Sequence, residues 1–326
     1  MSGSIDDTYR AVVDDLPASL RAAALDLLGG ARWGDFFQLE PCRDLPVFAA
    51  VPELDLRGDR LAAWRRAHHG ACFYGVLADL LADRQLARSS EHDRLLFYLL
   101  DHWRRALAEA EGDAPLADRI ISKGMRLWAL GVRAEQAALA RRALGLARYA
   151  RIVLFKLGWG GIAAECALRR LPDARRVACF RRAYLLLMLS LQCVDDAMDA
   201  EEDAALQGAS APAALGLPPN ALFAAGAWLA RAVAREARAG GFAHLEHWSG
   251  TRAEELQRLM RERITAEDKL AGLAVSSALE ETCRSMAARF RACGSGGSGA
   301  ITSSGRSASD LPRRISSSST TPSFVP

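Results

Sequence analysis

The sequence predicts an all-α protein that folds as a single-domain helical bundle. From residue 61 onward, long segments rich in Ala, Leu and Arg place apolar residues at helical spacing. No stretch alternates apolar and polar residues as a half-buried strand does, and no Asn-Gly or Asp-Gly pair marks a hairpin. Half of the 326 residues are apolar, which is enough for the core of one sizeable domain or of two small ones. We therefore expect roughly eight to ten helices and no sheet.

Helix-breaking residues divide the chain into three parts. Residues 1–55 form an N-terminal helical region that is interrupted by Gly29-Gly30 and by a proline-containing stretch at 41–52. Residues 56–293 form the predicted bundle, with no detectable internal repeat. Within the bundle, Gly- or Pro-containing breaks are expected at 111–113, 172–173, 209–219 and 240–241. Residues 294–326 are a Gly/Ser-rich tail with too little apolar surface to fold, so we expect this tail to be disordered.

Composition excludes several classes of function. The net charge is only +3, so the chain lacks the basic footprint of a nucleic-acid-binding protein. Its seven cysteines are scattered and never form a C-x-x-C pair, which argues against a disulfide framework and a zinc site. We see neither a signal peptide nor a transmembrane segment. These features predict a cytoplasmic protein that binds no nucleic acid, and they allow a homodimer.

One stretch, residues 183–203, combines the most apolar run of the chain with a dense acidic cluster. Its first twelve residues carry no charge and include five leucines, which is typical of a buried helix. Six acids follow within nine residues: Asp195, Asp196, Asp199, Glu201, Glu202 and Asp203. Asp195, Asp199 and Asp203 are spaced i, i+4, i+8, so they repel one another on one helix face. A Mg²⁺ ion would neutralise them, while the alternative is a solvated helix end.

A second acidic pair lies on another apolar helix, predicted around residues 68–85. Asp79 and Asp83 are spaced i, i+4 among large apolar side chains. Helical bundles build metal sites from carboxylates that point inward from facing helices. We therefore expect this helix to face the Asp195 cluster across a metal site.

These motifs resemble the class I isoprenoid synthases, the family of terpene synthases and trans-prenyl synthases. Residues 191–199, LQCVDDAMD, are similar to the second prenyl-synthase motif F-Q-x-x-D-D-x-x-D, and their spacing also fits the terpene-cyclase triad N-D-x-x-S-x-x-x-E. Residues 79–83 look like the first motif, D-D-x-x-D, with Leu80 in place of the second aspartate. Residues 156–159, KLGW, lie where prenyl synthases carry a diphosphate-contacting lysine. The resemblance covers about residues 61–259 and implies a helical bundle around a central cavity.

The resemblance also implies a prenyl diphosphate substrate and three Mg²⁺ ions. The expected metal ligands are Asp79, Asp83, Asp195, Asp196, Asp199 and Asp203. Basic side chains that would act on the diphosphate are Lys156, Arg181 and Arg182, although for the two arginines a solvated helix start is the competing interpretation. Aromatic side chains that would line the substrate pocket are Phe73, Tyr74, Phe97, Tyr98, Trp128, Phe155 and Trp159, each of which could equally be ordinary core packing.

Departures from the family motifs leave three functions open. Residues 1–60 contain nothing like G-G-K-x-x-R-P, the element that binds isopentenyl diphosphate in chain-elongating enzymes, and the loop at 207–216 lacks its lysine. A site that keeps the metal motifs but loses the second diphosphate pocket would ionise one substrate, as a terpene synthase does. The alternatives are a prenyl-chain or squalene/phytoene-type synthase that condenses two diphosphates, and a non-catalytic helical scaffold derived from such an enzyme.

Overall fold

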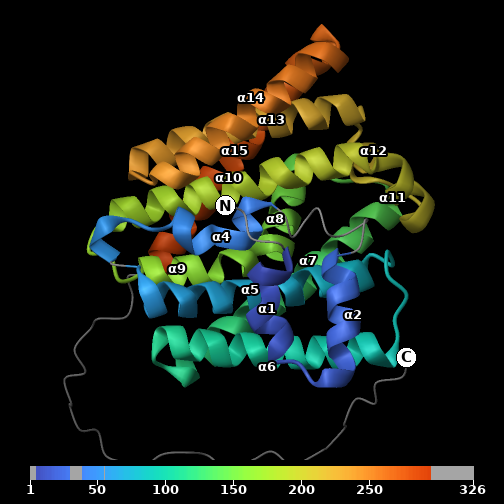
Figure 1. Cartoon of the computed structure of the whole chain (residues 1–326). Coiled ribbons are helices and arrows are strands. Elements are labelled where there is room, and N and C mark those ends of the chain that lie inside the picture. Colours follow the sequence, from blue (N-terminus) through green and yellow to red (C-terminus); the bar gives the residue numbers. More distant parts are fainter. Residues whose placement is uncertain (1–4, 30–38, 55, 295–326) are drawn as a thin grey trace, which may run out of the picture.

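The computed structural model describes residues 5–29, 39–54 and 56–294, and all of its regular elements are helices (Figure 1). The N-terminal region contains α1 (Ile5–Asp14), α2 (Ala18–Gly29), α4 (Glu40–Phe48) and the short 3₁₀ helix η1 (Pro52–Leu54). The bundle begins with α5 (Gly58–Ala82), α6 (Ser90–Glu111), α7 (Ala114–Arg141), α8 (Leu146–Leu157), η2 (Gly158–Gly161) and α9 (Ile162–Leu168). It continues with α10 (Ala174–Met198), α11 (Ala200–Gln207), α12 (Ala211–Leu215), α13 (Pro219–Gly240), α14 (Ala243–Arg263) and α15 (Ala266–Gly294).

The all-α prediction is confirmed for the described residues, which contain no strand. The described helices outnumber the eight to ten expected, because α9, α11 and α12 are short separate helices rather than ends of longer ones. Gly208 and Gly216 help to separate the short helices. Gly208 directly follows α11 and Gly216 directly follows α12, and both glycines have a positive φ, which residues with a Cβ rarely adopt. Most of the predicted tail, residues 295–326, lies outside the described residues.

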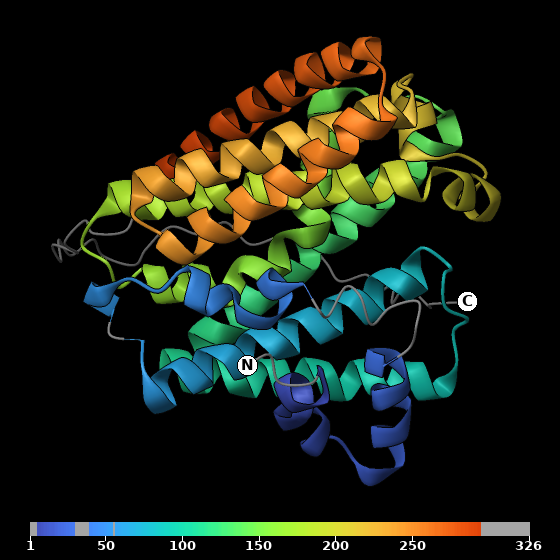
Figure 2. The same ribbon diagram turned by 45° about the horizontal axis from the view of Figure 1, so that its top comes forward.

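The helices form two layers with shorter helices between them (Figures 1 and 2). Helices α10, α13, α14 and α15 pack together on one side, and α5 and α6 pack together on the other. Helix α8 contacts α7, α10 and α15, while α9 contacts α4, α5 and α10, so both connect the layers. This arrangement brings the acid-bearing helices α5 and α10 to opposite sides of the space beside α8.

The N-terminal region packs into the same hydrophobic core as the bundle. Helix α1 contacts α5, α2 contacts α6, and α4 contacts both α5 and α14. Tyr9 is fully buried, its ring meets Phe73 of α5 edge to face, and its hydroxyl donates to the Cys42 carbonyl at 2.9 Å. Because no separate core lies under α1, α2 and α4, we expect these helices to fold together with the bundle.

Helix α10 differs from the predicted helix at both of its ends. It begins at Ala174, where the Asp173 carboxylate accepts hydrogen bonds from two backbone N–H groups of the first turn. It ends at Met198, because Asp199 leaves the helical conformation with φ −97° and ψ 10°. The expected continuous helix through Asp203 is therefore interrupted, and Asp203 lies in the first turn of α11, where the helix dipole favours an acid.

By length and composition alone, α10 is also the one helix in the described residues that could cross a membrane. However, 67% of its most apolar window is buried inside the fold, as in the core helix of a bundle. Its apolar length is therefore accounted for by packing against α13 and α8.

Two glycines allow aromatic side chains to approach helices closely. A Cβ at Gly75 of α5 would overlap the Trp159 indole, and a Cβ at Gly161 would overlap the Tyr184 ring. Trp159 and Tyr184 both reach the interior of the bundle through these contacts, and both are buried. The side chains that surround the central space are thus positioned by small residues on the facing elements.

Candidate functional site

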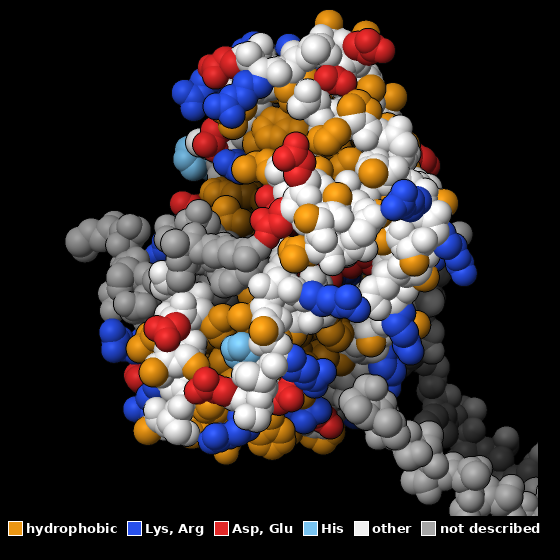
Figure 3. All heavy atoms as spheres, turned by 90° about the vertical axis from the view of Figure 1, so that its right-hand side faces the viewer, with side chains coloured by type: hydrophobic (Ala, Val, Ile, Leu, Met, Phe, Trp, Pro, Cys, Tyr) orange, Lys and Arg blue, Asp and Glu red, His pale blue; other side chains and the backbone are white. Residues whose placement is uncertain are grey.

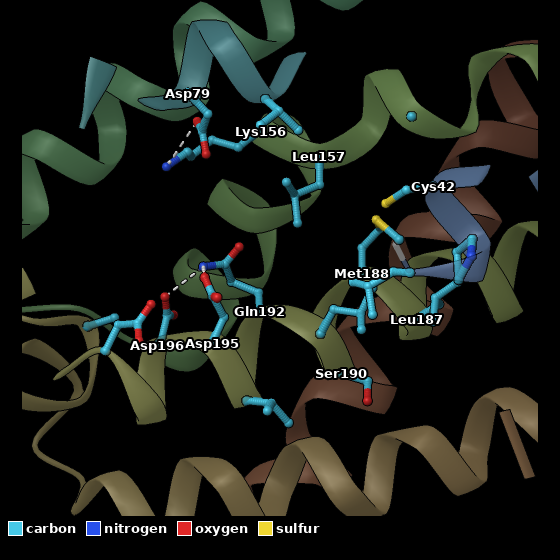
Figure 4. A pocket seen from close by; sticks show the side chains of 18 of the residues that line it. Cys42, Asp79, Lys156, Leu157, Leu187, Met188, Ser190, Gln192, Asp195 and Asp196 are labelled. Carbon is cyan, nitrogen blue, oxygen red and sulfur yellow. Dashed lines mark hydrogen bonds and ion pairs between the residues drawn. The ribbon is translucent and has the colours of Figure 1, made fainter. Parts of the chain in front are cut away.

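A cavity of about 570 Å³ lies between the two layers. Its lining comes from α4, α5, α7, α8, η2, α10, α11, α12, α13 and α14. The charged side chains labelled in Figure 4 lie apart from Cys42, Leu187 and Met188. Carboxylates, Lys156 and Gln192 gather at one end of the cavity. Cys42, Leu187 and Met188 lie toward the other end (Figure 4), and Leu45, Cys72 and Trp248 also line the cavity. All six aspartates predicted as metal ligands line this one cavity, together with Lys156.

The acidic end of the cavity reaches the molecular surface. Met198, at the end of α10, lines the cavity and is 71% exposed. On the face shown in Figure 3, acidic side chains lie next to a hollow with hydrophobic walls. A ligand with a charged head and an apolar tail could enter here with its tail directed inward.

The first acid cluster consists of Asp79 of α5, Asp83 directly after the end of α5, and Glu135 of α7, gathered around Lys156 of α8. The Lys156 ammonium lies 2.6 Å from Glu135 Oε2, 3.0 Å from Asp83 Oδ2 and 3.3 Å from Asp79 Oδ1. Only 5% of Lys156 is exposed, so this contact is shielded from bulk water. The three carboxylates therefore have a cation supplied by the chain itself.

Burial and charge act against each other in this cluster. Burial alone lowers the pKa of Lys156, but the three nearby carboxylates outweigh it and raise that pKa well above its ordinary value. Burial raises the pKa of Asp79 to about 7 and that of Glu135 to about 7, although the ammonium opposes both shifts. One ammonium is thus too little positive charge for the three partly buried carboxylates, and Lys156 remains protonated among them.

The second acid cluster consists of Asp195 and Asp199 at the end of α10 and Asp203 in α11. Desolvation beside the cavity raises the pKa of Asp203 to about 6, and repulsion from Asp199 adds to that shift. Asp195 is exposed but lines the same cavity, and local desolvation and repulsion from Asp199 raise its pKa as well. None of the three forms an ion pair with any Lys, Arg or His of the described ranges. The second cluster therefore lacks the internal cation that the first cluster has.

Asp196 stands apart from its neighbours because both of its oxygens already accept hydrogen bonds. The Tyr149 hydroxyl donates to Oδ2 at 2.7 Å, and the Gln192 amide donates to Oδ1 at 2.7 Å. Burial raises the pKa of Asp196 to about 7, against the hydrogen bond from Tyr149. Because Tyr149 belongs to α8 and Asp196 to α10, this hydrogen bond joins the helix that carries Lys156 to the helix that carries Asp195.

The oxygen donors of the second cluster suit a hard divalent cation. Asp195, Asp199 and Asp203 provide carboxylates one helical turn apart and facing the cavity, and carboxylate oxygens are the ligands that Mg²⁺ prefers. Within the described residues, however, no three His, Cys, Asp or Glu side chains already surround a common metal position. A cation held there would need further oxygen donors from water or from a bound anion, which is the usual way that Mg²⁺ binds in proteins.

The other predicted residues are only partly brought to the cavity. Trp159 lines it, whereas the remaining aromatic candidates do not: Phe73, Tyr74, Phe97, Tyr98, Trp128 and Phe155. Phe73 is buried in the core, Tyr74 packs on Trp103, and Phe97 is 67% exposed on the surface.

The two predicted catalytic arginines lie in the middle of α10, away from the cavity lining. Arg181 pairs with Glu165 of α9, and Arg182 pairs with Glu236 of α13. Both contacts join α10 to a neighbouring helix, and the structure gives neither arginine a place near the acidic clusters.

The sequence prediction missed Glu135, Tyr149 and Gln192, which contact the charged groups directly. A single acid on the amphipathic helix α7 carries no local signal that separates it from a solvated residue. Gln192 occupies the glutamine position of the F-Q-x-x-D-D-x-x-D motif, so that motif could have identified it.

No family model matches the chain, and neither a curated protein nor a solved structure matches it. Arguments about function therefore depend on the motifs and on the geometry of the cavity.

Proposed function

We propose that this protein is a Mg²⁺-dependent class I terpene synthase that ionises an allylic prenyl diphosphate and directs the resulting carbocation to a terpene product. The observation that carries the proposal is the single cavity that joins both predicted acid pairs to an apolar interior. The acidic end suits a metal-bound diphosphate head, and the apolar end suits a prenyl chain. The resemblance of residues 79–83 and 191–199 to the family motifs supports the same assignment.

In this proposal Asp195, Asp199 and Asp203 hold Mg²⁺ with the diphosphate. The metal supplies electrostatic stabilisation of the leaving group as its negative charge develops. The chain's own residues then provide a dry pocket, because water would trap a carbocation. Leu187, Met188 and the other apolar wall residues exclude water, and an aromatic face such as that of Trp159 stabilises a nearby cation by about 0.5–2 kcal/mol.

A turnover assay tests the proposal. Purified protein is incubated with Mg²⁺ and, separately, with geranyl, farnesyl and geranylgeranyl diphosphate, and both hydrocarbon products and released diphosphate are measured. We expect one of the three to give a terpene product at equal rates with and without isopentenyl diphosphate. Asp199→Asn should abolish turnover, whereas Glu201→Gln, an exposed acid outside the cavity lining, should keep it.

Other outcomes of the same assay assign the alternatives. Products that require two diphosphates would identify a prenyl-chain or squalene/phytoene-type synthase. Complete absence of turnover with all substrates, in well-folded protein, would contradict an enzymatic role.

A non-catalytic helical protein is the second candidate, and one observation favours it. Lys156 already neutralises part of the first acid cluster, which lowers the demand for metal on that side of the cavity. Such a protein would bind an apolar ligand in the cavity and would release no diphosphate.

A further inference from the structure

The first acid cluster is arranged around an ammonium group. The carboxylates of Asp79 in α5, of Asp83 directly after α5 and of Glu135 in α7 lie 3.3, 3.0 and 2.6 Å from Lys156 Nζ. Lys156 is itself buried, with 5% of its surface exposed, and it belongs to a third helix, α8. The ammonium therefore bridges α5 and α7. A divalent cation that was to bind Asp79, Asp83 and Glu135 together would have to occupy the same position.

Packing around the Lys156 stem holds the ammonium in this position. At Gly131 of α7, a Cβ would lie 3.1 Å from Lys156 Cγ and 3.1 Å from the Lys156 backbone nitrogen. Helices α7 and α8 are therefore in close contact at the root of the side chain, with Glu135 one helical turn after Gly131. Because the stem is confined there, the Lys156 ammonium could leave the cluster only by breaking its contacts with all three carboxylates.

Most of the hydrogen-bonding capacity of the ammonium is already used within the cluster. Two of its three N–H groups donate to Asp83 and Glu135, while Asp79 Oδ1, at 3.3 Å, forms an ion pair with it but no hydrogen bond. A diphosphate that approached Lys156 would have to compete with all three carboxylates. This differs from the sequence prediction, in which Lys156 contacts the diphosphate directly.

We infer that Lys156 is a built-in cation that excludes divalent metal from the first acid cluster. The metal ions of the proposed function are then held from one side of the cavity, by Asp195, Asp199 and Asp203. The claim that Asp195, Asp199 and Asp203 hold the metal rests on the proposed function. The claim that metal is excluded from the first acid cluster rests on the Lys156 contacts alone. Lys156 is a positioning residue in this account: it holds α5, α7 and α8 together beside the metal-binding side.

The inference is tested by counting bound Mn²⁺ ions by electron paramagnetic resonance, with inorganic diphosphate present. Lys156→Met should bind one more Mn²⁺ per chain than the wild type, because it frees three converging carboxylates. Lys123→Met, which removes an exposed lysine from α7, should bind the wild-type number. An unchanged count in Lys156→Met would overturn the inference.

A second variant keeps the test independent of how well Lys156→Met folds. Asp83→Asn should bind the same number of Mn²⁺ ions as the wild type, because Asp83 serves the lysine and not a metal. Loss of one ion in Asp83→Asn would overturn the inference and return the first cluster to the metal site.

The Mn²⁺ counts separate failure of the proposed function from failure of the inference about Lys156. If the wild type binds no Mn²⁺ with diphosphate, the proposed function is contradicted. A gain of one ion in Lys156→Met would still support the role of the lysine.

Discussion

Removal of the Lys156 ammonium should destabilise the protein in a way that depends strongly on pH. In Lys156→Met the apolar stem is largely retained, while Asp79, Asp83 and Glu135 lose the cation that they share. Removing one partner of a buried ion pair typically costs about 3–5 kcal/mol, because the remaining charge is left buried and unpaired. A domain somewhat smaller than this chain loses roughly 2–4 °C in melting temperature per kcal/mol, so we expect a fall of about 6–20 °C at pH 8.

The sign of the pH dependence follows from the carboxyl groups. Even with the lysine present, burial raises the pKa of Asp79 and of Glu135 to about 7, above their ordinary values. Loss of Lys156 raises both further, since the ammonium opposes the shift. A group with a raised folded-state pKa favours folding at low pH, and this contribution is lost as the pH rises through that pKa. The deficit of the variant should therefore be largest at pH 8 and should shrink toward pH 5.

The assay is thermal and urea unfolding of wild type, Lys156→Met and the control Lys123→Met, each at pH 8 and pH 5 without metal. The control should match the wild type within about 0.5 kcal/mol, as surface substitutions usually do. A Lys156→Met deficit below about 1 kcal/mol at pH 8, the range of exposed ion pairs, would refute the claim that this is a buried cation. An equal deficit at both pH values would refute the assignment of the effect to unpaired carboxylates.

Three further predictions concern other parts of the site. Gly75→Ala should destabilise the protein by about 1–3 kcal/mol in urea unfolding despite the better helix propensity of alanine, because the new methyl group overlaps the Trp159 indole; an unchanged or higher stability would contradict this packing. Tyr149→Phe should cost about 1–3 kcal/mol because it removes the 2.7 Å hydrogen bond to the buried Asp196 carboxylate, and a loss of only a few tenths would mean that the bond adds little. Burial lowers the pKa of His68 to about 4, so its ring should remain neutral in NMR titrations from pH 8 down to about pH 5. In the unfolded chain this ring takes up a proton near pH 6.5. The stability that the neutral His68 ring contributes should therefore be complete above pH 6.5 and should decline by about 1.4 kcal/mol per pH unit as the pH falls toward 4. A His68 ring that titrates near pH 6.5 in the folded protein would contradict this.

The fold class and the meeting of the two acidic helices could be predicted from the sequence, because both depend on patterns along the chain. Helical spacing of apolar residues predicts buried helices, and an acid within such a helix stands out against its apolar neighbours. Asp79, Asp83 and Asp195 were identified in this way, and the structure brings them to one cavity.

The partners of these acids could not be predicted, because they come from other helices. Glu135 and Lys156 meet only because α7 and α8 pack closely at Gly131, a tertiary contact that leaves no periodic signal. Of the aromatic candidates, Trp159 lines the cavity and the others do not, for a related reason: hydrophobicity indicates burial but does not separate a cavity wall from a filled core. Phe97 is exposed on the surface, because a single apolar side chain in contact with water costs little free energy.

The break in α10 was also beyond sequence reasoning. Residues 195–203 contain neither Gly nor Pro, yet α10 ends at Met198 and Asp199 has a non-helical conformation. This break lets Asp195 lie at the end of one helix and Asp203 at the beginning of the next, while both still face the cavity.

The most direct test of the central claim, a cavity that binds diphosphate through Mg²⁺ at the second acid cluster, is a thermal shift. With Mg²⁺ and inorganic diphosphate together at about 100 times the dissociation constant, the wild type should gain about 2.7 kcal/mol, while either component alone should give less. Asp199→Asn should be at least as stable as the wild type without metal, because it relieves repulsion, and it should lose this gain. Glu201→Gln, whose side chain lies outside the cavity lining, should keep it. No shift in well-folded wild type, or a shift that survives in Asp199→Asn, would contradict the account.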